Sequence, residues 1–321
     1  MRKVWIDTLR AFAIFFVVFG HQAYWCDNFF VITTPIKMPL FFAITGYLFK
    51  SEAISFLAKL KHLLYRVGIP WFALGLSPII VACVWKGNFL RIGNYILDMI
   101  SGKVLWFMPC FIISEIIFFL NLRLSKRKEC LIAGICVSEC IIGYILGVHH
   151  IADYAMINRA LIAQLFMGVG YFFKQYEKNL IKVPFILLLL LFFVGLSLSF
   201  LEYNLIGFLV DVHMNQYPCF LVDMIVIVIE CYFMFYLFCR INLGNKISAY
   251  VGRNTLLIFI LAPYFSTAIY KLLILLHISI TNSYILALAV TIFIIMIGSL
   301  LSEICAFYVP WVIGLKKKNY K

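Results

Sequence analysis

Long apolar runs separated by short polar gaps fill the chain from end to end. A membrane-spanning helix needs about 20 predominantly apolar residues, and most of the runs approach that length. The pattern therefore predicts an all-α protein with about ten transmembrane helices, at residues 8–26, 36–50, 66–85, 104–123, 130–148, 157–174, 183–201, 219–239, 254–275 and 284–308. The second run is short and contains proline and glycine, so the pattern defines its ends poorly.

The positively charged residues are concentrated in alternate gaps. With the N-terminus placed in the cytoplasm, 21 of the 27 Lys and Arg residues fall on the cytoplasmic side and six on the other. Cytoplasmic loops of membrane proteins carry such an excess. An odd number of helices would smear the asymmetry, so it also supports ten helices with both termini in the cytoplasm.

Composition leads to the same class of protein. The chain has 321 residues, of which 64% are hydrophobic and 13% charged, whereas soluble domains carry roughly 25% charged residues. The apolar runs cover the whole length, which predicts a single integral membrane domain over residues 1–321, embedded in a lipid bilayer. The net charge of +13 comes from residues that orient the chain in the membrane, so we expect no binding to nucleic acid. The ten cysteines lie mostly within apolar runs, as packing residues do, and we expect no metal site.

Arg10 and His21 lie in the first apolar run, eleven residues apart. Eleven steps of an α-helix return to within roughly 20° of the starting direction and rise about 16 Å, so both side chains project from one stripe. Ionisable groups in a membrane helix face the protein interior or water. The structural alternative is that Arg10 extends to the membrane interface while His21 is a hydrogen-bonded core histidine. Asp7, one turn before Arg10, favours a functional pair because it can hold the guanidinium.

Two further polar residues stand at or within predicted helices. Arg66 follows a basic gap that contains Lys61, and it either anchors the third helix at the membrane surface or binds an anionic ligand. Glu115 lies inside the fourth predicted helix and needs a partner there. It either orients His21, binds a substrate hydroxyl or forms a purely structural pair.

These elements, in this order, resemble acyltransferase family 3, a family of bacterial membrane O-acyltransferases that includes fucose 4-O-acetylase-like and polysaccharide O-acetyltransferases. The family marker, an Arg and a His separated by ten residues in the first helix, is matched by Arg10 and His21. The other elements that match are Pro39–Gly46, Arg66 with Pro70, Leu105-Trp106-Phe107, Phe166–Tyr171 and Val251–Thr255. The resemblance spans nearly the whole chain. In one departure, many relatives carry a His just before the proline of the ninth helix, where this chain has Ala262.

The resemblance implies transfer of an acetyl group from cytosolic acetyl-CoA to a hydroxyl of a cell-surface or lipid-linked glycan, in a bacterial cytoplasmic (inner) membrane. His21 would act as the general base. The other candidate residues are Arg10, Asp7 and Glu115 for catalysis, and Arg10, Lys61, Arg66 and Trp106 for binding of the donor. The acceptor would contact outer loops at residues 149–153 and 202–217.

Alternatives stay open at this point. A polysaccharide exporter or flippase without acyl-transfer chemistry would also use broken helices with buried charges. For an acyltransferase, direct transfer and a covalent acetyl-His intermediate both fit the residues. The acceptor sugar, the length of the short acyl group and the oligomeric state cannot be read from this sequence.

Overall fold

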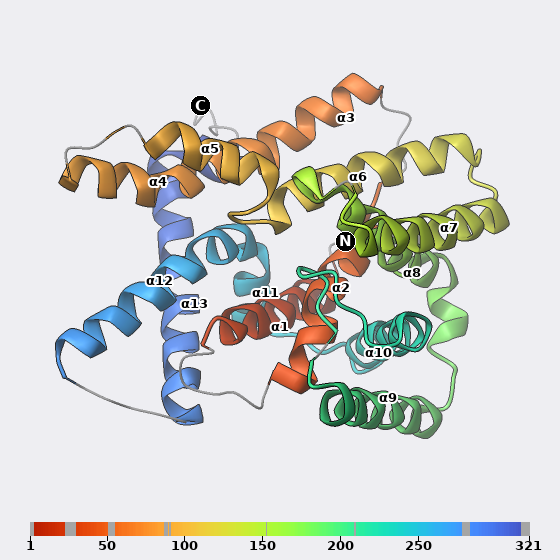
Figure 1. Ribbon diagram of the computed structural model, residues 1–321. Coiled ribbons are helices and arrows are strands. Elements are labelled where there is room, and N and C mark those ends of the chain that lie inside the picture. Colours follow the sequence, from red (N-terminus) through yellow and green to blue (C-terminus); the bar gives the residue numbers. More distant parts are fainter. Residues whose placement is uncertain are drawn as a thin grey trace.

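The computed structural model describes residues 3–22, 30–50, 55–86, 89, 91–151, 153–208, 210–277 and 283–315. Within these ranges the chain is helical, apart from turns and one isolated antiparallel bridge between Asp211 and Gln216. The all-α prediction is therefore confirmed. The helices (Figure 1) are α1 Val4–Gly20, α2 Phe30–Leu48, α3 Phe56–Leu63, α4 Ile69–Lys86, α5 Arg91–Ser101, α6 Phe107–Leu124, α7 Glu129–Val148, α8 Ile157–Leu180, α9 Phe185–Ile206, α10 Phe220–Arg240, α11 Lys246–Arg253, α12 Thr255–Leu275 and α13 Tyr284–Tyr308. Short π or 3-10 turns occur at Leu64–Gly68, Tyr154–Met156 and Pro310–Ile313.

Eight helical segments in the described ranges are long and apolar enough to cross a membrane, which makes the chain a multi-pass membrane protein. They are Phe56–Val81, Phe107–Leu124, Glu129–Val148, Tyr154–Leu180, Phe185–Ile206, Phe220–Arg240, Thr255–Leu275 and Tyr284–Tyr308. The central helix α1 has 17 residues. A total of ten spans and the cytoplasmic position of both termini stay predictions.

Two predicted boundaries differ from the structure. The third span, predicted to begin at residue 66, continues a helix that already starts at Phe56. The Ser55 hydroxyl caps that helix by accepting the Ala58 N–H at 3.2 Å, and lysines in the first turns hide it from a search for apolar runs. The first span, predicted at 8–26, is helical over Val4–Gly20, and its residues 23–26 lie outside the described residues.

Two short helices were not predicted because each is too short and too polar to form an apolar run. Helix α5 has 11 residues and α11 has eight. Asn245 and Ser248 form a capping box at the start of α11, in which each side chain accepts the backbone N–H of the other, an arrangement that satisfies two otherwise unpaired donors. Helix α11 packs against α1, the helix that carries the candidate residue Arg10.

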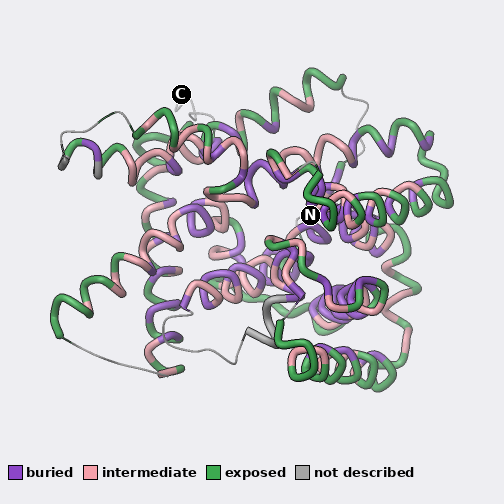
Figure 2. Tube along the Cα trace, in the orientation of Figure 1, coloured by how far each residue is buried: buried purple, intermediate pink, exposed green. Residues whose placement is uncertain are grey.

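The core lies where α1, α2, α8 and α10 meet. Figure 2 shows the buried residues concentrated on these helices in the middle of the structure, whereas α9 at the periphery is largely exposed. An exposed apolar helix surface of this kind is what a lipid environment requires. The candidate residues on α1 therefore sit at the centre of the bundle.

Helices α2 and α8 approach so closely that only glycine fits at two contact points. A Cβ at Gly46 would overlap the carbonyl of Met167, and a Cβ at Gly170 would overlap the carbonyl of Ala43. Small residues permit this kind of helix contact in membranes. Thus the two sequence elements Pro39–Gly46 and Phe166–Tyr171 are two sides of one helix interface, and Gly46 admits another backbone.

Replacement of Gly170 by Ala should therefore destabilise the protein. The added methyl group must push α2 away from α8, and overpacking of this kind costs about 1–3 kcal/mol. The matched control is Gly134→Ala on α7, where the new Cβ would meet nothing within 4 Å. Thermal unfolding in detergent measures the difference. Equal midpoints for the two variants would contradict the packing argument.

Candidate active site

Helix α1 carries Arg10 toward its N-terminal end and is followed directly by His21 at its C-terminal end. Arg10 lies in the first half of the helix, and His21 immediately follows the last helical residue, where its backbone N–H bonds to the Val18 carbonyl at 3.1 Å. Both side chains are half-buried. At 1.5 Å per residue their positions on the helix are about 16 Å apart, so the two side chains lie in separate environments.

At the Arg10 end lies a cavity of about 590 Å³. We call it the cationic cavity; its charged and titratable lining residues are Arg10, Lys50, Lys59, His62, Arg66 and Glu115. Lys59 forms an ion pair with Glu115. The cations outnumber the carboxylate, so the cavity carries a positive field suited to an anionic ligand.

A second cavity, of about 230 Å³, shares Arg10 and Arg66 with the first and adds a third guanidinium, from Arg253. We call it the aromatic passage; its aromatic members are Phe41, Phe107, Phe111 and Phe259. The ring centroids of Phe107 and Phe259 are 4.8 Å apart. The passage leads from the arginines into the apolar interior between α2, α6 and α12. His21 lines neither cavity.

A π-helical turn over Leu64–Gly68 presents Arg66 to the cationic cavity. In a regular α-helix, the ring of Pro70 would clash with the carbonyl of Arg66 and leave it without its usual N–H donor. Widening to a π turn relieves this conflict. Gly314 covers the same site, because a Cβ there would come within 2.7 Å of the Arg66 carbonyl oxygen. The pairing of Arg66 with Pro70 thus has a local structural cause.

Arg253 reaches the aromatic passage through the contact of α11 with α1. A Cβ at Gly252 would overlap the carbonyl of Asp7, so glycine is required for the two helices to meet here. Arg253 also donates from Nε to the Ala249 carbonyl at 3.1 Å. Asp7 is buried on α1, where its backbone supports the short helix that carries Arg253.

The remaining candidates at this end divide in two. Glu115 shares the cationic cavity with Arg10 and pairs with Lys59, which places it with the Arg10 end of α1 and not with His21. Lys61 is exposed and is not among the residues that line the cavity, whereas Lys59 is. The two lysines fall on different sides of the same helix, a distinction that the sequence alone did not resolve.

At the other end, His21 belongs to a polar group that we call the His21 cluster: His21, Lys37, Asp211 and His213. The ammonium of Lys37 on α2 lies against the end of α1, because a Cβ at Gly20 would come within 3.0 Å of its Nζ. The charge of Lys37 acts on both histidines, and the charge of Asp211 acts on Lys37. Three elements, α1, α2 and the α9–α10 connection, meet here.

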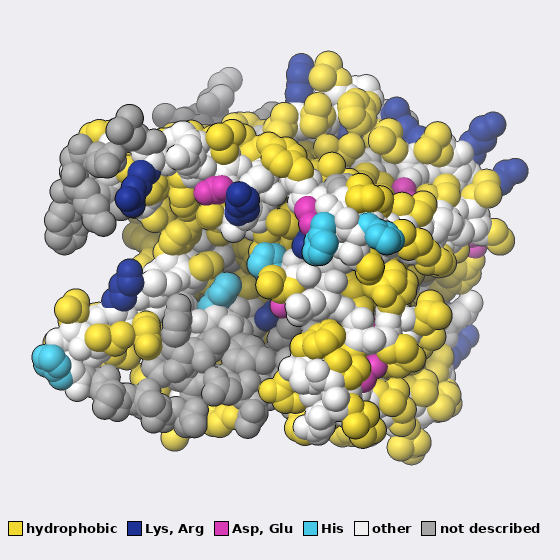
Figure 3. Space-filling model, viewed as in Figure 1, with side chains coloured by type: hydrophobic (Ala, Val, Ile, Leu, Met, Phe, Trp, Pro, Cys, Tyr) yellow, Lys and Arg dark blue, Asp and Glu magenta, His cyan; other side chains and the backbone are white. Residues whose placement is uncertain are grey.

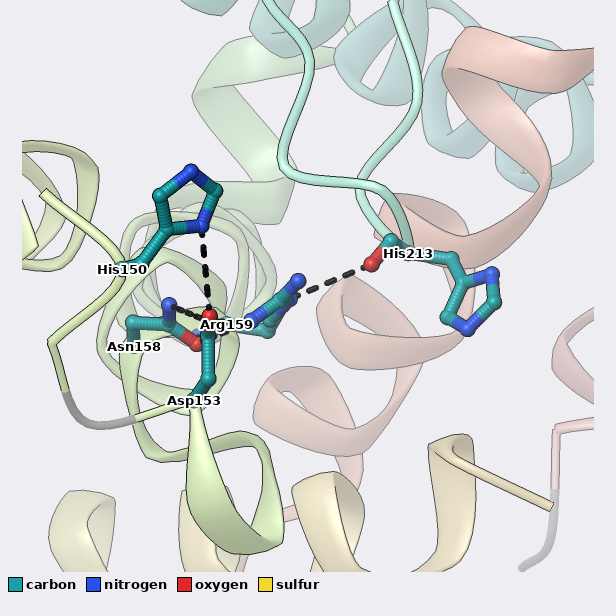
Figure 4. Close-up of polar contacts among 5 residues, drawn as sticks. All are labelled: His150, Asp153, Asn158, Arg159 and His213. Atoms are coloured by element: carbon teal, nitrogen blue, oxygen red, sulfur yellow. Dashed lines mark hydrogen bonds and ion pairs between the residues drawn. The ribbon is translucent and has the colours of Figure 1, made fainter. Parts of the chain in front are cut away.

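Arg159 braces the connection that carries His213 (Figure 4). Its guanidinium donates to the Asp153 carboxylate and, from Nε, to the His213 carbonyl at 3.1 Å. Asn158 also donates to Asp153, at 2.6 Å. Arg159 is 9% exposed, so it links the loop before α8 to the loop before α10 from within the protein. The two loops expected to contact an acceptor are therefore tied together.

The ionisation of these loop residues follows from their contacts. Burial raises the pKa of Asp153, but the hydrogen bonds from Asn158 and Arg159 outweigh it, so this pKa lies below its ordinary value. The ion pair is thus complete at neutral pH and is lost only as the pH falls through the lowered pKa. Burial lowers the pKa of His213, and Arg159 and Lys37 act in the same direction against the opposing charge of Asp211. His213 is accordingly neutral at physiological pH.

Trp106 lies on this side of the protein and not in the cationic cavity. Its ring stacks on His213 with centroids 4.9 Å apart and an interplanar angle of 23°. The preceding Leu105 has φ of 52°, a left-handed conformation that side chains rarely adopt, and this turn carries Trp106 away from the aromatic passage that Phe107 enters. Trp106 lines neither cavity, and its role in donor binding stays a prediction.

Several residues of these two regions were not among the candidates from the sequence, including Lys37, Arg159, His213 and Arg253. The signal for Lys37 and Arg159 was present, because each is a charge at the end of or inside an apolar run. Among the residues that the structure describes, no group of three or more His, Cys, Asp or Glu side chains is arranged to hold a metal ion.

The chain matches the family model of an acyltransferase domain over residues 3–304. It therefore belongs to acyltransferase family 3 and is a membrane acyltransferase. Searches of curated proteins and of solved structures found no match. The family marker Arg10 and His21 thus bridges the two polar regions of the fold.

Replacement of Arg159 by Met should release the braced loops. The side chain makes several charge-assisted hydrogen bonds, and loss of one or two such bonds costs about 1.5–3 kcal/mol, which corresponds to roughly 10- to 100-fold faster amide exchange where the exchange reports local opening. Hydrogen exchange of residues 210–217 measures the effect. The control is Lys103→Met, which removes an exposed ion pair of 3.7 Å with Asp98. Unchanged protection in the Arg159 variant would show that the brace is dispensable.

Proposed function

We propose that this membrane acyltransferase moves an acetyl group from acetyl-CoA to a hydroxyl of a cell-surface or lipid-linked glycan, with His21 as the general base. The observation that carries the proposal is the placement of the family marker: one helix presents Arg10 to a cationic cavity and His21 to a polar cluster about 16 Å away. A donor and an acceptor can therefore approach the same helix from its two ends.

The cationic cavity suits the nucleotide part of acetyl-CoA. Arg10 and Arg66 provide planar guanidinium groups, which pair with phosphate in a bidentate manner, and Lys59 adds a further positive charge. Arg253 adds a third guanidinium from the adjoining aromatic passage. A volume of about 590 Å³ lies within the usual range of ligand pockets, about 300–1,000 Å³. We assign the phosphates of the donor to this cavity.

The aromatic passage suits the rest of the donor. The acyl-pantetheine arm is long and narrow, and we place it between Phe41, Phe107 and Phe259, pointing toward the His21 end of α1. Opening of the ring contact between Phe107 and Phe259 would let the thioester advance to His21. The site is thereby shielded from bulk water, which limits hydrolysis of the thioester.

The reaction itself requires one base and one proton carrier. His21 takes the proton of the acceptor hydroxyl as its oxygen attacks the thioester carbonyl. The tetrahedral intermediate then collapses, the C–S bond breaks, and the thiolate of CoA takes the proton from His21. The acceptor is esterified and CoA leaves as the free thiol, so His21 returns to its starting state.

The acceptor approaches from the side of the His21 cluster. Figure 3 shows histidine, acidic and basic side chains gathered in the middle of one face, with a mainly hydrophobic surface around them. The ring of Trp106 and the braced loops border this region, and aromatic and hydrogen-bonding groups together suit a sugar. We place this face outside a bacterial cytoplasmic membrane and the Arg10 end inside, in accord with the distribution of positive charges.

His21→Ala should abolish acyl transfer. Loss of a general base lowers the rate by about 10²–10⁴-fold, whereas binding of acetyl-CoA at the Arg10 end should persist. Membranes supplied with labelled acetyl-CoA and tested for label in glycan measure the reaction, and His277→Ala, which changes an exposed histidine just after α12, is the control. Wild-type membranes that export glycan but never transfer the label would establish the exporter instead.

Arg10→Ala should weaken use of the donor more than the chemistry. Removal of one guanidinium from a phosphate site raises the KM for acetyl-CoA, by roughly tenfold if one charged hydrogen bond of about 1.5 kcal/mol is lost. Lys61→Ala is the matched control, because Lys61 lies close in sequence to the cavity residue Lys59 but does not line the cavity. A change confined to the choice of acceptor sugar would show that Arg10 does not bind the donor.

A further inference from the structure

Lys37 is a half-buried charge for which the proposed reaction so far has no role. Its ammonium lies against the last turn of α1, at a distance that only a glycine at position 20 permits without displacement. It lies at the end of α1 that carries His21, and a neutral imidazole can accept a hydrogen bond but brings no negative charge to balance the ammonium. An ammonium placed in an apolar helix is costly unless it meets an anion.

The described anion near Lys37 is Asp211, and the fold holds it in place. The Asp211 carboxylate accepts the backbone N–H of His213 at 2.7 Å and that of Met214 at 3.3 Å. Asp211 and Gln216 are also joined by the antiparallel bridge. Asp211 is therefore a fixed negative charge whose field acts on Lys37, and Arg159 secures the same loop from the other side.

An ammonium beside the base has the position that a developing oxyanion needs. We propose that Lys37 is a catalytic residue, which stabilises the negatively charged oxygen of the tetrahedral intermediate, and that Asp211 positions it. This inference rests on the acyl transfer proposed above and adds the group that receives the charge.

Every bond that forms in the proposed transfer is matched by a bond that breaks. As the acceptor oxygen bonds to the carbonyl carbon, the C=O π electrons move to the carbonyl oxygen, which becomes an oxyanion beside the Lys37 ammonium. His21 holds the proton from the acceptor hydroxyl. When the C=O bond re-forms, the C–S bond breaks and the CoA thiolate takes the proton from His21. Lys37 keeps its proton throughout and acts by charge and hydrogen bonding alone.

Three variants test the assignment. Lys37→Met keeps the apolar length of the side chain and removes the charge, and it should lower kcat by about 10²–10³-fold, the usual loss for one oxyanion donor. The KM for acetyl-CoA should not change, since the donor phosphates bind at the other end of α1. Lys37→Arg should restore part of kcat because it restores the charge. Lys271→Met, at an exposed lysine on α12, is the matched control and should leave kcat unchanged.

Gly20→Ala supplies an independent test that leaves Lys37 in the protein. The new Cβ would lie 3.0 Å from the flexible end of the Lys37 side chain, so the ammonium is displaced while the fold is kept. A small misplacement of a catalytic group costs up to about 10²-fold, and we expect a loss of 10- to 100-fold in kcat with a normal melting temperature.

The outcomes separate this inference from the proposed function. If wild-type membranes do not transfer label from acetyl-CoA, the proposed function fails and Lys37 with it. If the wild type is active and Lys37→Met keeps kcat within threefold, the role of Lys37 alone is wrong. Equal losses in Lys37→Met and Lys37→Arg, together with lower melting temperatures, would show that the lysine is structural and would also overturn the assignment.

Discussion

The structure depends on one constraint: a charge inside an apolar bundle must reach water, an opposite charge or a ligand. The described part of the chain meets it in different ways at the two ends of α1. At the Arg10 end, Lys59 is paired with Glu115 and the arginines face a cavity. At the His21 end, Arg159 is paired with Asp153, and Lys37 is near Asp211. The lining of the cavity at the Arg10 end contains more cationic than acidic side chains, so its field favours an anion.

The second determinant is the close approach of backbones, which decides where the charges lie. Gly252 lets α11 rest on the Asp7 carbonyl and so delivers Arg253. The π turn enforced by Pro70 presents Arg66, and Gly20 admits Lys37 to the end of α1. In each case a small residue or a helix irregularity sits beside the functional side chain. The site is therefore built by backbone geometry as much as by the choice of charged residues.

Much of this could be predicted from the sequence because hydropathy and helical periodicity are local properties. The apolar runs gave the all-α class and most of the long helices, and the eleven-residue spacing put Arg10 and His21 on one helix. Arg66, singled out from its motif with Pro70, lines the cationic cavity. These inferences needed no knowledge of which helices touch.

What the sequence could not provide are contacts between distant segments. The predicted role of Trp106 in donor binding rests on its place in a sequence element. In the structure, the left-handed backbone at Leu105 turns the Trp106 ring toward His213. The sequence alone does not distinguish Lys59 from Lys61, and only the orientation of their helix shows that Lys59 lines the cavity. In the sequence Arg159 is one positive charge among many. Its distant partner, the His213 carbonyl, lies on a loop more than 50 residues away.

The departure at Ala262 has a physical interpretation in the same terms. Ala262 is buried on α12, one turn before Ser266, whose hydroxyl accepts a hydrogen bond of 2.9 Å from Gln22, the neighbour of His21. Position 262 thus faces the end of α1, where relatives with a His would place a second imidazole. In this chain α12 contributes only apolar and hydroxyl groups there, and the titratable partners come instead from α2 and the 210–217 loop. The requirement for titratable groups around His21 is therefore met from parts of the fold other than α12.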